Sequence, residues 1–215
     1  MTAASMPTPG RWLLLIRHGE TPLNVARVLQ PAATPLSDRG VAQAKALARR
    51  LAGAGLAGLI SSDLPRARQT AEAIAAACGL NMVLTPLLHE RNFGDLRGLP
   101  YDSLGFDPLA SDAAPPGGES QAEFSARARA AWLQVLALAA HAHGALAVVT
   151  HGLVIREWLQ RGALTLGPGM DLPARLGNTS LTIVEPAAPH RVTLLNCTAH
   201  LDVEAAEDAA SLSGG

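Results

Sequence analysis

The sequence predicts an α/β protein: a three-layer sandwich with a mostly parallel central sheet and helices on both faces. Short apolar runs of strand length alternate with amphipathic stretches of helix length along most of the 215 residues. Several runs are apolar on both faces, as strands are when helices cover both sides of a parallel sheet. Two of them end alike, each in a histidine followed by a glycine. Alternation of this kind favours βαβ units.

The first strand and the first long helix lie in the N-terminal quarter. Residues 12–16 (WLLLI) form a short apolar run, which predicts a buried strand. Residues 36–55 then predict a helix, with Ser37 as its N-cap and the glycines after Leu51 as its stop. The side chains expected on its apolar face are Val41, Ala44, Leu47 and Leu51.

A second strand and helix follow. Residues 57–63 (AGLISSD) predict a strand that ends in polar residues. Pro65 suits the first turn of a helix, which Gly79 closes. Residues 81–88 predict a third strand, and Pro86 places it at a sheet edge or at a strand end.

The second half begins with a loop and ends in two closing strands. Residues 101–120 have loop composition, and Ser120 with Glu123 forms a capping-box pattern before the next helix. The apolar stripe of that helix is Phe124, Ala128, Ala131, Val135 and Leu138. The other expected elements are a buried strand over 145–150, a helix over 153–162, and strands over 180–185 and 191–197.

Length and charge limit the classes of protein. One domain over residues 1–215 is expected, with a core at about 12–201 and a flexible tail at about 203–215, although two small domains stay open. The formal net charge of −1 gives no general attraction for nucleic acid or an anionic membrane. No apolar run approaches the roughly 20 residues of a membrane span. The N-terminus lacks the pattern of a signal peptide, so a cytoplasmic location is the default.

The two cysteines predict neither a disulfide framework nor a zinc site. Cys78 and Cys197 are too few for the first and have no metal-ligand spacing. The remaining histidines show no paired metal spacing either. We therefore expect no metal in the site.

Both histidine–glycine pairs come directly after expected strands. Because sites in such sheets lie beyond the carboxyl ends of the strands, His18 and His151 are expected in one crevice. Arg17 offers a planar fork for phosphate oxygens, and Gly19 allows close approach of the backbone to a ligand. A neutral His18 is a competent nucleophile. For the tripeptide Arg17-His18-Gly19 alone, a purely structural interpretation also stays open, in which the histidine bonds a backbone carbonyl and the arginine is solvated.

The tripeptide belongs to a longer series of motifs. In chain order they are LLLIRHGETPLN, SSDLPRARQTA, LLHERNFGDLRG, PGGES and VVTHGLVIR, followed by GNTSLTI and NCTAHL. Together they resemble the histidine phosphatase superfamily, which includes cofactor-dependent phosphoglycerate mutases and related phosphatases. The resemblance runs from about Trp12 to Leu201. It implies a phosphoglycerate mutase-like fold and a covalent phosphohistidine intermediate.

The resemblance also implies roles for five residues. His18 matches the nucleophile, Arg17 its phosphate-binding neighbour, and Arg66 the second phosphate-binding arginine. His151 matches the second histidine, which contacts the transferring phosphate. Glu90 matches the usual proton donor.

Four further positions are expected to contact the substrate. Asn24 matches a polar residue at the rim of the pocket, and Gly152 follows the second histidine. In the GNTS motif, a backbone N–H near Asn178 or Thr179 would face the phosphate.

The physical chemistry of phosphate esters agrees with these roles. The transition state spreads negative charge over the phosphoryl oxygens, so catalysis is mostly positioning and fixed positive potential. Arg17, Arg66 and His151 would supply that potential, and no cofactor is expected. Glu90 must be protonated in the first step and must accept a proton from water in the second. Burial would raise its pKa and the arginines would lower it, so the sequence leaves the direction open.

A metal-independent phosphomonoesterase acting on a small phosphorylated metabolite is the preferred function. The first alternative is a phosphoglycerate mutase, but Tyr101 stands at the position of a substrate-binding lysine, and no basic pair precedes PGGES. The second alternative is a non-catalytic phospholigand-binding protein, which the presence of the expected catalytic residues weighs against. Exposed residues near the closing strands could pair two copies into a homodimer.

Overall fold

The central sheet of the molecule has six strands. The computed structural model describes residues 10–201, so the tail expected at about 203–215 lies outside the described residues. The strand order is β3-β2-β4-β1-β5-β6. In chain order the strands are β1 Leu13–Arg17, β2 Leu56–Ser61, β3 Val83–Leu84, β4 Ala145–Thr150, β5 Leu181–Val184 and β6 Val192–Cys197.

Most of the strand pairs are parallel. β1 pairs with β4, and β2 pairs with both β4 and β3, all in parallel. Only the closing strands differ: β5 is antiparallel to β1, and β6 is antiparallel to β5. The predicted mostly parallel sheet is confirmed, with an antiparallel hairpin closing one edge.

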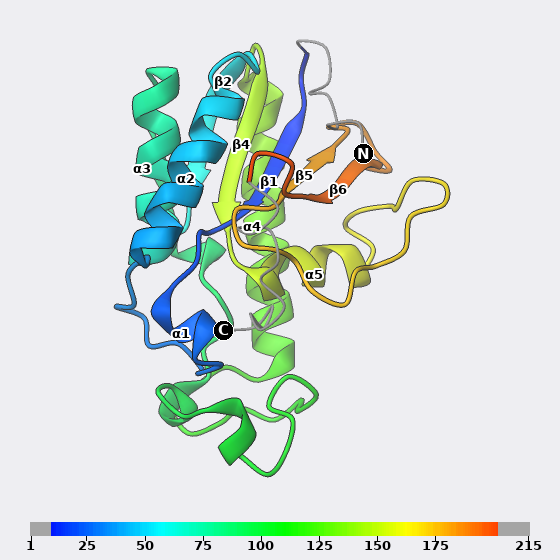
Figure 1. The fold of residues 1–215 in the computed structure, drawn as a ribbon. Coiled ribbons are helices and arrows are strands. Elements are labelled where there is room, and N and C mark those ends of the chain that lie inside the picture. The colour runs from blue at the N-terminus through cyan, green and yellow to red at the C-terminus, as the bar shows by residue number, and fades with distance from the viewer. Residues whose placement is uncertain (1–9, 202–215) are drawn as a thin grey trace.

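Helices cover both faces of the sheet (Figure 1). The side chains of β1 alternate between two apolar clusters, because successive residues of a strand point to opposite faces. Leu13 and Leu15 pack in the cluster that includes residues of α4 and α5, whereas Leu14 and Ile16 pack in the cluster with α2 and α3. The helices are α1 Pro22–Val25, α2 Asp38–Leu51, α3 Pro65–Cys78, α4 Gln121–His141 and α5 Gly152–Gln160.

Three of the predicted helix caps agree with the structure. Ser37 accepts the Gly40 N–H at the start of α2, and Gly79 ends α3 in the left-handed conformation. Ser120 and Glu123 form the expected capping box of α4. Local hydrogen bonds therefore fixed these boundaries.

Three sequence predictions need correction. The strand expected over 81–88 is only Val83–Leu84, because Thr85 caps a 3-10 turn that begins at Pro86. Val41 is 37% exposed. Gln43 is buried instead, and its side chain accepts the Glu20 N–H. The glycines do not cap α2, which ends at Leu51 with Ala52 in right-handed geometry.

A long segment lies beyond the carboxyl ends of β1 and β4. Residues 86–120 contain only the short 3-10 turns Pro86–Leu88, Gly94–Leu96 and Tyr101–Ser103. Figure 1 shows this green segment beyond the tip of β4 and beside α1. No helix within residues 10–201 combines the length and the apolar composition that crossing a bilayer requires.

Candidate active site

The two histidines lie side by side because their strands are parallel neighbours in register. Arg17 pairs with Thr150, so the next residue of each strand is a histidine at the same sheet edge. The ring centroids of His18 and His151 are 5.1 Å apart at an angle of 60°, and both side chains are fully buried. The structure therefore brings the two histidines together, as the sequence led us to expect.

The hydrogen bonds of His18 define its tautomer. Its Nδ1 lies 2.7 Å from the carbonyl oxygen of Gly19. A carbonyl can only accept, so Nδ1 carries the proton and Nε2 carries the lone pair. Nε2 is buried and has no hydrogen-bond partner among the described residues. Burial, then Arg66 and Arg17, lowers the pKa of His18 well below its usual value, so the ring is neutral at pH 7.

His151 has the complementary arrangement. Its Nε2 is 2.9 Å from the hydroxyl of Ser62, and its Nδ1 has no partner among the described residues. Burial, followed by the charge of Arg66, lowers its pKa well below the usual value. Each imidazole thus keeps one ring nitrogen available to a ligand.

Two buried guanidinium groups surround the histidines. Arg17 donates from Nη1 to the carbonyl of Leu176. Arg66, near the start of α3, has Nε and Nη1 without partners in the described part of the chain. Burial lowers the pKa of Arg66 to about 10, so it remains charged at neutral pH. Buried donors of this kind are costly unless an anion satisfies them.

Glu90 is the acidic member of the cluster, and its carboxylate is held by two backbone donors. The N–H groups of Arg91 and Leu153 donate to Oε1 and Oε2, each at 3.1 Å. Burial raises the pKa of Glu90 to about 7 against the opposing effects of these bonds and of Arg66. The sequence left open whether the pKa of Glu90 is raised or lowered. It is raised, because desolvation has a larger effect than the nearby donors and charges.

A partly buried ion pair helps to hold the loop that carries Glu90. Arg127 of α4 donates from Nε and Nη2 to the two carboxylate oxygens of Glu119, at 2.7 Å each. The same guanidinium donates to the carbonyls of Leu87, His89 and Glu90. Glu119 belongs to the PGGES motif, so the structure gives that motif a place in the site. The sequence interpretation did not include Arg127.

The backbone after β1 is also tightly held. A Cβ added to Gly40 would lie 2.0 Å from the carbonyl oxygen of Glu20, and one added to Gly19 would lie 2.7 Å from that of Gly40. The absence of side chains at these two positions lets the loop after His18 pack directly on the start of α2.

Asn24 and the GNTS residues are buried close to His18. The Oδ1 of Asn24 accepts from the Thr21 N–H and the Asn178 side chain, whereas its Nδ2 has no partner among the described residues, so a contact with the substrate stays a prediction. The N–H of Thr179 donates to the carbonyl of His18 at 3.1 Å, so it is not directed to a phosphate. Of the two candidate backbone donors, Asn178 alone remains. Gly152 is buried at the first position of α5.

His200 connects to His18 through Thr179. Its Nε2 lies 2.9 Å from the Thr179 hydroxyl, and its Nδ1 lies 3.4 Å from Nη1 of Arg50. Since Arg50 can only donate, Nε2 carries the proton and donates to Thr179. Burial and Arg50 lower the pKa of His200 to about 4, so the ring is neutral. The sequence interpretation gave His200 no role.

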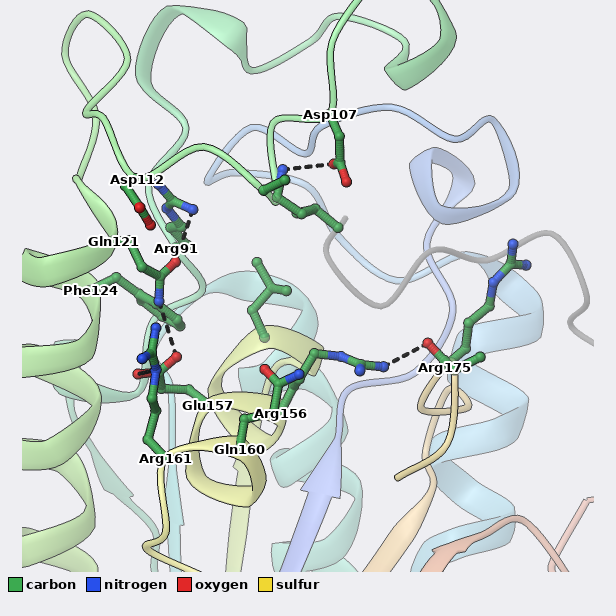
Figure 2. Close-up of a pocket in the computed structure, with 14 residues that line it drawn as sticks. Arg91, Asp107, Asp112, Gln121, Phe124, Arg156, Glu157, Gln160, Arg161 and Arg175 are labelled. Atoms are coloured by element: carbon green, nitrogen blue, oxygen red, sulfur yellow. Dashed lines mark hydrogen bonds and ion pairs between the residues drawn. The ribbon is translucent and has the colours of Figure 1, made fainter. Parts of the chain in front are cut away.

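A cavity of about 430 Å³ is lined in part by residues of α5 (Figure 2). Arg91 and Leu153 line it, and they are the residues whose N–H groups hold the Glu90 carboxylate. Figure 2 shows Arg156, Glu157 and Gln160 entering from α5, with Asp107 approaching from the opposite side.

The fold and this cluster of histidines and arginines define the class to which the protein belongs. A sequence profile of the histidine phosphatase superfamily (branch 1) matches residues 13–198. The chain belongs to this superfamily. The resemblance seen in the motifs is thus confirmed over nearly the whole chain.

Individual relatives include a mutase by name and several phosphatases. The "Probable phosphoglycerate mutase GpmB" of Yersinia pestis (strain Pestoides F) is 37% identical over 210 residues, covering 90% of this chain and 96% of the relative. A mycobacterial glucosyl-3-phosphoglycerate phosphatase in complex with VO₃ is 30% identical with a TM-score of 0.73, covering 87% of this chain and 100% of that one. A mutant phosphoserine phosphatase from Entamoeba histolytica, in complex with phosphoserine, is 26% identical with a TM-score of 0.72, covering 89% and 99%.

Proposed function

We propose that the protein is a phosphomonoester hydrolase that acts on a small phosphorylated metabolite through a phosphohistidine at His18. The observation that carries this proposal is a neutral imidazole whose Nε2 has no hydrogen-bond partner within residues 10–201, buried beside Arg17 and Arg66 and in contact with His151. A nucleophilic lone pair beside fixed positive charge is the arrangement that phosphoryl transfer requires. Phosphatases among the solved relatives support the hydrolase assignment.

In the first step, Nε2 of His18 attacks phosphorus and the bond to the alcohol oxygen breaks. The leaving oxygen takes the proton of Glu90. Arg17, Arg66 and His151 stabilise the charge on the phosphoryl oxygens. A Glu90 pKa of about 7 leaves a large fraction of the carboxyl protonated at neutral pH.

In the second step, the Glu90 carboxylate takes a proton from water, and the oxygen of that water attacks phosphorus. The P–N bond breaks, inorganic phosphate leaves, and His18 returns to its neutral form. The proton on Glu90 is then in place for the next ester. The guanidinium groups supply the positive potential, so we propose that no metal or cofactor is required.

The test is hydrolysis of 4-nitrophenyl phosphate in the presence of EDTA. We expect wild-type activity without added metal and none in His18→Ala. Acid-quenched labelling with a ³²P ester should trap an alkali-stable, acid-labile phosphoenzyme in the wild type only. Undiminished activity in His18→Ala, or no label on repeated trapping, would contradict the mechanism.

A phosphoglycerate mutase is the second candidate, and the name of the Yersinia relative favours it. A mutase returns the phosphoryl group to a bound acid and needs basic groups for the carboxylate of phosphoglycerate. Tyr101 occupies the position of one such group, which weighs against this reading. Incubation with 3-phosphoglycerate and a bisphosphoglycerate primer separates the two, since a hydrolase releases phosphate and a mutase forms 2-phosphoglycerate.

A further inference from the structure

We propose that the Ser62 hydroxyl fixes the tautomer of His151, so that His151 offers an N–H donor to an oxygen of the phosphoryl group. The inference rests on the proposed hydrolase function and adds a positioning residue to its site. It follows from the burial of both side chains, from the partners of the Ser62 hydroxyl and from the ring nitrogen of His151 that has no partner among the described residues.

The sheet places Ser62 beside His151. Ser62 directly follows β2, and His151 directly follows β4. These strands are parallel neighbours in which Ser61 pairs with Val149, and the Ser62 N–H donates to the Val149 carbonyl at 3.0 Å. The Ser62 hydroxyl lies 2.9 Å from Nε2 of His151. Both residues are fully buried, so their polar atoms have to find partners inside the protein.

The partners of the Ser62 hydroxyl decide the direction of this hydrogen bond. Its oxygen accepts the N–H of Leu64 at 3.3 Å, which leaves the hydroxyl proton to be donated elsewhere. Within residues 10–201, the acceptor available to that proton is Nε2 of His151. A buried hydroxyl without an acceptor is costly, so Ser62 donates and Nε2 accepts with its lone pair.

The proton of His151 must then be on its other ring nitrogen. Burial, followed by the charge of Arg66, lowers the pKa of His151 well below its usual value, so the ring is neutral and has a single N–H group. Because Nε2 uses its lone pair to accept from Ser62, that N–H is at Nδ1. The partner of one imidazole nitrogen sets in this way which nitrogen carries the proton.

The two imidazoles therefore present opposite polarity to a ligand. His18 offers the lone pair of Nε2, whereas His151 offers the N–H of Nδ1, and the ring centroids are 5.1 Å apart. In the described part of the chain nothing accepts the Nδ1–H of His151, and a buried donor is costly to leave unpaired. An oxygen of a phosphoryl group at His18 can accept it. In the other tautomer, a lone pair would face the negative oxygens and destabilise the transition state.

The tautomer can be measured in the wild-type protein without a ligand. Two-bond ¹H–¹⁵N correlation spectra of ¹⁵N-histidine-labelled protein at neutral pH distinguish a protonated from an unprotonated ring nitrogen. The signals that are lost in His151→Gln belong to His151. We expect a ring protonated at Nδ1 alone. A proton on Nε2 would overturn the proposal, and this measurement needs no variant of Ser62.

Removal of the hydroxyl tests what the tautomer contributes to the rate. Ser62→Ala should lose the uniform Nδ1–H signal of His151 and lower kcat/KM for 4-nitrophenyl phosphate about ten- to hundredfold, the effect of one hydrogen bond to a charged group. Ser62→Thr keeps the hydroxyl and should keep the signal and most of the rate. Ser61→Ala is the matched control, because Ser61 is equally buried but its hydroxyl donates to the Ser62 carbonyl. This control should keep the wild-type signal and rate.

The possible outcomes separate this inference from the hydrolase proposal. If the ³²P ester labels His18 but Ser62→Ala keeps the wild-type signal and rate, the role of Ser62 is wrong and the hydrolase stands. Equal losses in Ser62→Ala and Ser62→Thr, or a similar loss in Ser61→Ala, would show an effect of packing and would also overturn the inference. If no phosphoenzyme forms in the wild type, the hydrolase proposal fails and the role of the Nδ1–H fails with it.

Discussion

In the proposed mechanism Glu90 changes its protonation state twice in each turnover, and its surroundings suit that task. Burial places its pKa at about 7, above the value of 4.5 for a solvated glutamate. The protonated form therefore dominates below about pH 7 and the carboxylate dominates above it. A group with this pKa can act as acid and then as base near neutral pH.

We expect kcat/KM of the wild type to fall as the pH rises through about 7, because the acid form of Glu90 is lost. Glu90→Gln should lack this basic limb. It should also lower kcat about a hundredfold or more for alkyl phosphates, whose leaving oxygen needs a proton, and much less for 4-nitrophenyl phosphate. Glu72→Gln on an exposed face of α3 is the matched control. A basic limb that persists in Glu90→Gln would assign the titration to another group.

His200 is expected to position the nucleophile without touching the phosphate. Thr179 has a φ of 52°, a left-handed conformation that is unfavourable for a β-branched residue, and the bond from His200 helps to hold it. Thr179 in turn anchors the carbonyl of His18. His200→Leu should lower kcat about tenfold with little change in KM. His200→Gln keeps an N–H donor and should restore most of the rate.

The control for this prediction is His141→Leu, at an exposed position near the end of α4. Rates of phosphoenzyme formation after rapid mixing give the relevant measurement. A parallel rise in KM, or equal losses in His200→Leu and His200→Gln, would show a general loss of structure instead.

The sequence could predict only part of this site. His18 and His151 follow apolar runs directly, so their strand-end positions were visible in the chain. Arg127 and His200 were given no role because their partners are far away in the sequence. Arg127 binds carbonyls 37 to 40 residues earlier. His200 binds Thr179, 21 residues earlier, and β5 and β6 lie between them in the chain. Neither contact leaves a local pattern in the sequence.

At the scale of elements, local signals were reliable and irregular segments were not. The caps at Ser37, Gly79 and Ser120 depend on neighbouring backbone groups, which is why sequence alone located them. The error at 81–88 arose because Val83 and Leu84 look like strand residues, whereas Thr85 and Pro86 convert the following stretch into a 3-10 turn. Apolar composition did not distinguish these two outcomes.

The Glu90 loop depends on one ion pair, so breaking that pair should affect both stability and rate. Arg127→Met removes the guanidinium from Glu119, whose side chain is only 20% exposed, and from three loop carbonyls. We expect a loss of about 3 kcal/mol, because the three hydrogen bonds to the loop carbonyls, about 1 kcal/mol each, are lost together with the partly buried pair. This corresponds to a fall in Tm of about 6–12 °C for a chain of this size. kcat should fall as well, because the backbone around Glu90 loses the three carbonyl contacts that Arg127 makes.

Arg68→Met provides the matched control. Arg68 pairs with Glu72 one turn away on α3, and both side chains are largely exposed. Such pairs contribute about 0.3–0.5 kcal/mol, so Tm should shift by about 2 °C or less. Thermal unfolding followed by circular dichroism measures both variants. Equal shifts in the two variants would mean that Arg127 contributes no more than a surface pair.

At the scale of the whole molecule, an almost neutral chain concentrates positive charge at one buried point. The formal net charge is −1, yet Arg17 and Arg66 are both buried. The nearby acidic group is Glu90. Positive charge spread over the surface would attract anions in general. Two buried guanidinium groups instead favour a single anion that can replace the water around both of them. The expected single domain and homodimer stay predictions, since both depend on properties of the whole chain in solution.

Inorganic phosphate should therefore stabilise the folded protein. A ligand that binds only the folded state at 100 times its Kd adds about 2.7 kcal/mol, or about 5–10 °C in Tm at this chain length. Sodium chloride at the same ionic strength should add much less, because its anion cannot accept hydrogen bonds from several donors at once. Arg66→Met should abolish the phosphate-dependent shift while Arg49→Met, an exposed arginine of α2, should keep it. Since each variant is compared with itself with and without phosphate, a change in its intrinsic stability does not affect the result. An undiminished shift in Arg66→Met would place the stabilising anion somewhere other than beside His18.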